Sequence, residues 1–169
     1  MDDFKFDEND PDGMFGSPLG EPGKGDADGA DEEKLVGVAG VYEHRSEEAN
    51  KSSEFVVLLR DELARTVLIV IGRFEAMAIS LALEGHSADR PLTHDLLNNV
   101  IGRLGGTLRR ILIDDLWNDT YYAKITIDTP AGELVVDSRP SDAIALALRA
   151  KAPIYMLEHV LREAGLRAE

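Results

Sequence analysis

Residues 138–149 decide the fold: they read SRPSDAIALALR, a polar turn followed by an apolar run. Ser141 is the predicted N-cap of a helix, because its side chain can accept a hydrogen bond from a backbone N–H of the first turn. Asp142 then lies in that turn, where the helix dipole favours an anion. Small and large apolar residues alternate from Ala143 to Leu148. This alternation allows close packing, so the stretch predicts a helix pressed tightly against its neighbours.

Segments rich in β-branched and apolar residues flank this helix, and this composition is typical of strands. They are residues 35–42, 55–59, 66–71, 108–114, 121–128 and 133–137. Turn residues at 118–119 and 130–132 separate the last three segments, so we expect an antiparallel meander there. Residues 152–155 are interpreted as a short edge segment, because Pro153 cannot donate a hydrogen bond to a ladder.

Three further helices are expected. The first spans residues 74–84, is stopped by Gly85, and carries an apolar stripe wide enough to predict burial on most sides. The second runs from Thr93, its predicted N-cap, to about residue 104. The last covers residues 157–164. The pattern therefore predicts a single compact domain of mostly antiparallel strands with about four helices.

Composition divides the chain into two parts. Residues 1–33 hold 12 acidic and 2 basic residues, which accounts for most of the formal charge of −14. This segment has few apolar residues and many glycines and prolines, so we expect a disordered acidic tail. Residues 34–167 form the expected domain. Because the 169-residue chain has no cysteine, disulfides, thiolate metal sites and a cysteine nucleophile are excluded.

No apolar run reaches the length of a membrane span, and the N-terminus lacks the basic and apolar regions of a secretory signal. We therefore predict a cytoplasmic protein without membrane contact. The excess negative charge also bears on nucleic-acid binding, because attraction to phosphate is the main source of non-specific affinity. A nucleic-acid site in this domain would need a local basic patch, a metal ion, or both.

Four blocks of the sequence, residues 71–79, 90–96, 138–149 and 152–155, resemble in order and spacing the bifunctional nuclease domain family. The resemblance covers about residues 35–166 and leaves the acidic tail outside. It implies an α+β fold, a homo-oligomer, and nuclease activity on RNA and DNA with little sequence specificity. Nucleic acid would then be the substrate.

Phosphodiester hydrolysis needs an activated water, stabilised charge on the phosphate and a proton for the leaving oxygen. Carboxylates that hold Mg²⁺ or Mn²⁺ can supply the first two, and a histidine with an arginine or lysine can act without a metal. The catalytic candidates are His94, Asp95, Glu75 and Asp142, with Asp95 and Glu75 as metal ligands. Two alternatives stay open: capping alone by Thr93 and Asp95, and a buried ion pair between Glu75 and an arginine such as Arg139.

The substrate-binding candidates are Arg139, Ser141, Arg149 and Lys151. The start of the helix after Pro140 offers free N–H groups beside Arg139, which suits a phosphate. The alternatives are an Arg139–Asp142 ion pair that locks the turn, a capping role for Ser141, and a solvated charged face that includes Arg149 and Lys151.

Two functions stay open at the level of the sequence. The first is a nuclease, which rests on the family resemblance. The second is a non-catalytic interaction or regulatory module that binds a protein or a small anionic ligand. The negative domain, the sparse basic patches and the lack of a complete catalytic motif favour the second.

Overall fold

The structure, a computed structural model, describes residues 32–44, 53–86 and 88–165, so nearly all of the predicted tail lies outside it. The strands of this part are β1 (Glu33–His44), β2 (Glu54–Asp61), β3 (Thr66–Ile71), β4 (Thr107–Trp117), β5 (Thr120–Thr129), β6 (Gly132–Ser138) and β7 (Ile154–Leu157). The helices are α1 (Arg73–Leu83), α2 (Thr93–Arg103), α3 (Pro140–Ala150) and α4 (Glu158–Ala164). The predicted α+β class, with mostly antiparallel strands and four helices, is confirmed.

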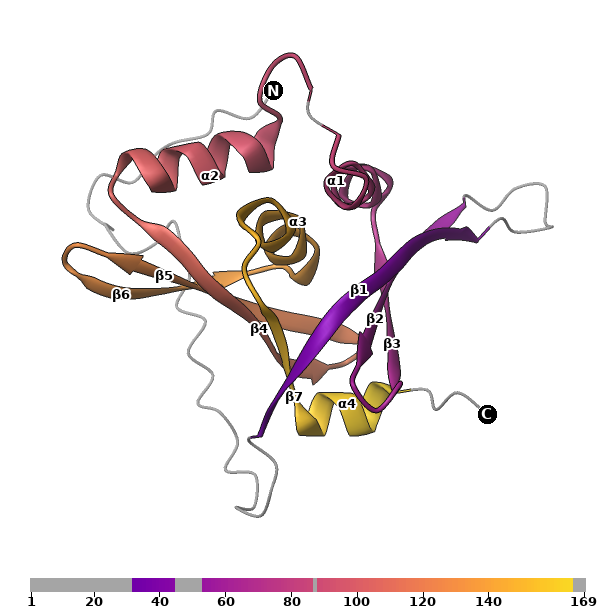
Figure 1. Ribbon diagram of the computed structural model, residues 1–169. Helices are drawn as coiled ribbons and strands as arrows, with labels where there is room; N and C mark the ends of the chain where they lie inside the picture. The colour runs from indigo at the N-terminus through magenta and orange to yellow at the C-terminus, as the bar shows by residue number, and fades with distance from the viewer. Residues whose placement is uncertain (1–31, 45–52, 87, 166–169) are drawn as a thin grey trace, which may run out of the picture.

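All seven strands form one sheet in the order β3-β2-β1-β7-β4-β5-β6. Every neighbouring pair is antiparallel except β4 with β7. The expected meander of β4, β5 and β6 is present. Helices α1, α2 and α3 lie on one side of the twisted sheet and α4 lies on the other (Figure 1).

The prediction of an edge position for residues 152–155 is wrong. Strand β7 lies in the middle of the sheet, between β1 and β4, and its residues Ile154 and Met156 are buried. Pro153 precedes the strand, so its missing N–H falls outside the ladder, while its carbonyl still accepts a hydrogen bond from the Ile111 N–H at 3.1 Å. A proline one residue before a strand therefore gives no reason to place that strand at an edge.

Helix α3 forms the centre of the core. Residues 143–147 have no exposed surface, as the alternation of small and large side chains predicted. The predicted caps are shifted, however. Arg139 is the N-cap of α3, which places Pro140 at the first helical position, where its fixed φ suits the helix, and Ser141 at the second. Ser141 is consequently not the cap.

Helix α2 begins in a similar way. Its N-cap is Leu92, and Thr93 is the first helical residue, so the predicted cap at Thr93 is wrong. The side chain of Asp95 instead accepts a hydrogen bond from the Leu92 N–H at 2.9 Å. A carboxylate in the third helical position thus accepts a hydrogen bond from the N–H of the N-cap residue, which is a different backbone group from the one that a Thr93 cap would have satisfied.

Helix α1 is not buried on most sides. It buries only Ala76 and Ile79, while Phe74 and Met77 are 78% and 53% exposed. The helix packs on α3 and on β1 and β2 through one face, and the Phe74 and Met77 side of its apolar stripe turns outward. Periodicity shows that a helix has an apolar side, but the number of neighbouring elements decides how much of it is covered.

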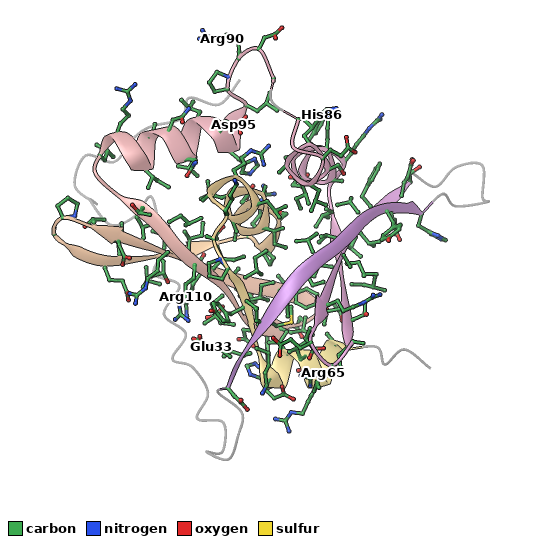
Figure 2. The ribbon with its side chains drawn as sticks, in the orientation of Figure 1. Glu33, Arg65, His86, Arg90, Asp95 and Arg110 are labelled. Atoms are coloured by element: carbon green, nitrogen blue, oxygen red, sulfur yellow. The ribbon has the colours of Figure 1, made fainter. Side chains whose placement is uncertain are left out.

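An ion-pair cluster fastens the opposite side of the sheet. Arg65, at the end of the β2–β3 turn, donates to Asp61 at 2.7 Å and to both carboxylate oxygens of Glu158 in α4 at 2.7 and 2.9 Å. Figure 2 shows Arg65 beside α4. The bond from Arg65 lowers the pKa of Glu158 more than burial raises it.

None of the described helices has the length and apolar content needed to cross a membrane.

Candidate active site

Three helices of one layer bring four of the predicted site residues together. Arg139 donates through Nη1 to Glu75 Oε1 at 3.2 Å and through Nε to Asp142 Oδ2 at 2.8 Å. The other oxygen of Asp142, Oδ1, lies 3.1 Å from His94 Nε2. Glu75 comes from α1, His94 from α2, and Arg139 and Asp142 from the start of α3. We call these four side chains the polar network.

The helix starts explain why the polar network forms. Arg139 and Asp142 are three residues apart in the sequence. Pro140 fixes the first turn of α3 between them, and this turn brings the two side chains within bonding distance. Gly72, the N-cap of α1, makes room for Glu75, because a Cβ at Gly72 would lie 2.2 Å from Glu75 Oε2. Both turns are therefore built around a charged side chain of the network.

Charge pairing stabilises the ionised forms of Asp142 and Arg139. Burial raises the pKa of the Asp142 carboxyl, but the hydrogen bonds and charges of Arg139 and His94 outweigh burial and hold that pKa below its ordinary value of 3.8. The bond to Asp142 in turn raises the pKa of Arg139. Asp142 is therefore an anion at neutral pH, and it can orient His94 and stabilise a positive charge on its ring.

Exposure differs strongly across the network. The His94 side chain is 12% exposed, whereas the Arg139 side chain is 66% exposed. Arg139 can thus meet a phosphate from solvent, while His94 is held in a partly desolvated position. This combination suits charge stabilisation by the arginine and proton transfer by the histidine.

Asp95 lies next to the network but bonds elsewhere. Its Oδ1 accepts from Arg149 Nε at 2.6 Å, and its Oδ2 accepts from the Leu92 N–H. Arg149 also donates through Nη1 to the carbonyls of Ala145 and Ala78, at 2.8 and 3.1 Å. Figure 2 shows Asp95 at the N-terminal end of α2. The pair joins the start of α2 to the end of α3 and to α1.

This pairing also affects Asp95 electrostatically. Burial raises the pKa of its carboxyl. The hydrogen bonds from Leu92 and Arg149 lower this pKa by more than burial raises it, so the pKa lies below 3.8. Both oxygens of Asp95 are occupied by protein donors, and one oxygen of Glu75 is held by Arg139. Within the described ranges, no three His, Asp or Glu side chains are placed to hold a metal ion. The Asp95 and Glu75 oxygens therefore do not fit a shared metal in this arrangement, and a requirement for Mg²⁺ or Mn²⁺ stays a prediction.

A groove of about 750 Å³ opens beside the polar network. Glu75, Arg139 and Ser141 line it together with strand β3 and the start of β5. The Tyr121 hydroxyl on β5 donates to the Leu68 carbonyl on β3 at 3.3 Å, which brings the edge strand β3 close to a strand far from it in the sheet order. The groove therefore lies where the curled sheet nearly meets itself. We call it the first groove.

The remaining candidates lie in different places. Ser141 is 7% exposed and lines the first groove. Lys151 lies at the opposite end of α3 from Arg139, as an exposed residue with a left-handed φ of 55°. Asn98 was not among the predicted residues, yet it lies one helical turn after His94 on the same face of α2. The four-residue spacing from His94 is enough to place Asn98 on that face of the helix from the sequence.

The fold and the network define the class of this protein: an α+β domain with an arginine, a histidine and two carboxylates at converging helix starts. A family model described as the bifunctional nuclease domain matches residues 56–169. The chain belongs to the bifunctional nuclease domain family.

Individual relatives are similar over about two thirds of the chain. An uncharacterized protein of Mycobacterium tuberculosis is 45% identical over 112 residues, which is 66% of this chain and 66% of that protein. A protein named bifunctional nuclease 1 from Oryza sativa subsp. indica is 28% identical over 116 residues, and one named bifunctional nuclease 2 from Arabidopsis thaliana is 21% identical over 118 residues. These matches cover 66% and 68% of this chain, but only 35% and 36% of the plant proteins.

Proposed function

We propose that this domain is a nuclease that hydrolyses phosphodiester bonds in RNA and DNA with little sequence specificity. The family and the names of the plant relatives support this reaction class. The observation that carries the proposal is the polar network, in which an exposed arginine and a positioned histidine share the Asp142 carboxylate.

Each member of the network has a role in the proposed reaction. Arg139 binds the non-bridging phosphate oxygens, with the Ser141 hydroxyl as a second contact. His94 removes a proton from water as the water oxygen attacks phosphorus, and the bond from phosphorus to the leaving oxygen breaks. Asp142 holds the ring and stabilises its cationic form. The ring then returns the proton to the leaving oxygen. Glu75 holds the guanidinium in place from the other side.

The proposal is tested by cleavage of labelled single- and double-stranded RNA and DNA by the purified protein. We expect His94→Gln to lower kcat by about 100-fold or more, because general acid–base catalysis contributes on that scale. His86→Gln is the matched control, since His86 is an exposed histidine outside the network. A folded His94→Gln variant that cleaves as fast as the wild type would remove His94 from the mechanism.

The same assay tests whether cleavage requires a metal ion. Cleavage that survives a chelator agrees with the arrangement of His94 and Arg139. Cleavage that requires added Mg²⁺ or Mn²⁺ would show that a carboxylate such as Glu75 or Asp95 leaves its ion pair and binds metal. Absence of cleavage, with saturable binding of a protein or small anion, would favour the non-catalytic module.

We further propose that the protein is a homo-oligomer assembled through the outer face of α2. Leu96, Val100 and Leu104 repeat at four-residue spacing along that face and are 57%, 44% and 77% exposed. Such a row of leucine and valine resembles the apolar centre of a homodimer interface more than a solvated helix. We place this oligomer in the cytoplasm, as the sequence predicts.

The oligomer is tested by the molar mass in solution. Leu96→Glu should lower the mass to that of a single chain, because a carboxylate would be desolvated in the interface. Leu63→Glu is the control, since Leu63 is a 75% exposed leucine in the β2–β3 turn. A single-chain mass for the wild type would contradict the proposal.

A further inference from the structure

A second groove, of about 550 Å³, lies along α2 beyond the polar network. Its side chains come from α2, from the strand that follows it, and from the end of α3. The polar ones are Asn98, Asn99, Arg103, Thr107 and Arg149. The volume is that of a small-molecule site and too small for a duplex, so it would hold a short stretch of one extended strand.

Charge distinguishes the two grooves. The first groove is lined by Glu75, Asp119 and Glu163 beside Arg139. The second groove is lined by two arginines and by no acidic residue, although the chain carries a net charge of −14. It is therefore the groove in which a polyanion would meet less repulsion.

Both arginines of the second groove are suited to an anion. Arg103 forms no ion pair within the described residues and is exposed. Arg149 is fixed by Asp95 and two carbonyls through Nε and Nη1, while its Nη2 donates to no acceptor in the described part of the chain. A rigid guanidinium with one unused nitrogen is a preorganised donor for a phosphate oxygen.

Helix α2 connects this groove to the network. His94, Asn98 and Gly102 follow one another at four-residue spacing and so form one row on the helix. Each step along this row is about 6 Å, and Arg103 lies about 13 Å from His94 along the axis. A strand with its scissile phosphate at His94 would therefore reach Arg103 only if it extended beyond a single phosphodiester.

We propose that the second groove binds the sugar–phosphate backbone of the substrate strand next to the cleaved bond, which rests on the proposed nuclease function. Arg103 and Arg149 contact phosphate oxygens, and the Asn98 and Asn99 amides donate to the backbone. These contacts carry no base information, which agrees with cleavage of both RNA and DNA. They bind polymeric substrates and do not act on a minimal phosphodiester.

Two substrates separate this role from catalysis: a labelled 12-nucleotide single strand and bis(p-nitrophenyl) phosphate. For Arg103→Gln we expect KM for the strand to rise by about tenfold, with kcat nearly unchanged, because a phosphate contact is lost. Hydrolysis of the small diester should not change. Arg162→Gln is the control, since it removes an exposed arginine from α4 on the opposite side of the sheet.

A second pair of variants tests the groove without removing a side chain. A Cβ at Gly102 would meet no atom within 4 Å, so larger residues fit there. Gly102→Glu places a negative charge in the groove and should raise KM for the strand, whereas Gly102→Gln has nearly the same size and should not. Equal KM values for these two variants would overturn the proposal.

Failure of this inference is distinguishable from failure of the proposed function. If the wild type cleaves both substrates and Arg103→Gln has an unchanged KM for the strand, the groove is not used and the nuclease stands. If the wild type cleaves neither substrate, binding of the labelled strand, measured by fluorescence anisotropy, tests the groove. Weaker binding by Arg103→Gln, with a salt slope smaller by about 0.7, supports the groove. No binding by the wild type, or unchanged binding by the variant, overturns it.

Discussion

Helices α2 and α3 have the same length of 11 residues and are buried in opposite ways. Helix α3 buries seven of its residues, whereas α2 buries none. The inward face of α2 carries His94, Asp95 and Asn98, and its outward face carries leucines and a valine. Helix α3 therefore holds the domain together, while α2 contributes polar groups to it and leaves an apolar face exposed.

Substitutions of leucine in the two helices give the largest expected contrast. Leu146→Ala in α3 should lower the free energy of unfolding by about 2–5 kcal/mol, because it empties a site with no exposed surface. Leu96→Ala in α2 should change it by about 0.5 kcal/mol or less in a single chain. Urea denaturation measures both. Similar losses in the two variants would contradict the comparison.

Protein concentration sharpens this test. If a second copy covers the outer face of α2, the stability lost in Leu96→Ala should depend on concentration, because association stabilises the folded state by mass action. The free energy of unfolding lost through the empty core site in Leu146→Ala should be the same at every protein concentration. Denaturation at two concentrations therefore reports on the fold and on the assembly separately.

Asp95→Ala should have the next largest effect on the free energy of unfolding. It removes the bond to the Leu92 N–H and leaves Arg149, 10% exposed, without its carboxylate. We expect a loss of about 1–3 kcal/mol in the free energy of unfolding. In the folded fraction kcat should be largely kept, while KM for the strand rises because Arg149 loses the carboxylate that fixes it. A folded variant with stability intact and activity lost would instead make Asp95 a catalytic residue or metal ligand.

The pH dependence of stability follows from the same carboxyl. Because the folded state holds the pKa of Asp95 below 3.8, its contribution to stability is complete above that pH and is lost as pH falls through the lower, folded value. The stability difference between the wild type and Asp95→Asn should therefore be constant near neutral pH and shrink in acid. A difference that grows in acid would contradict this linkage.

The sequence predicted the elements better than their surroundings. For α3, the alternation of small and large apolar residues predicted close packing, and residues 143–147 are fully buried. The same reasoning failed for α1, where Phe74 and Met77 are exposed, because periodicity does not count the elements that surround a helix. It also failed for β7, where Pro153 lies one residue outside the ladder.

The sequence named the residues of the polar network but not all of their contacts. Glu75, His94, Arg139 and Asp142 were all candidates, and the ion pair of Arg139 with Asp142 was an explicit alternative, since three-residue spacing at a helix start permits it. The partner of Asp95 was not predictable in this way. Arg149 lies 54 positions further along the chain, and only the packing of α2 on α3 brings the two together.

Gly102→Ala tests the comparison at its smallest expected effect. Gly102 lies inside α2, where an added Cβ would meet open space, and glycine there costs conformational entropy that alanine does not. We expect the free energy of unfolding to rise by about 0.5–1 kcal/mol, as in other exposed helices. Thermal denaturation against Gly105→Ala provides the contrast, because Gly105 has a φ of +82° that alanine adopts with strain. A destabilised Gly102→Ala would show that the α2 surface at the second groove is covered, and not open as its low burial indicates.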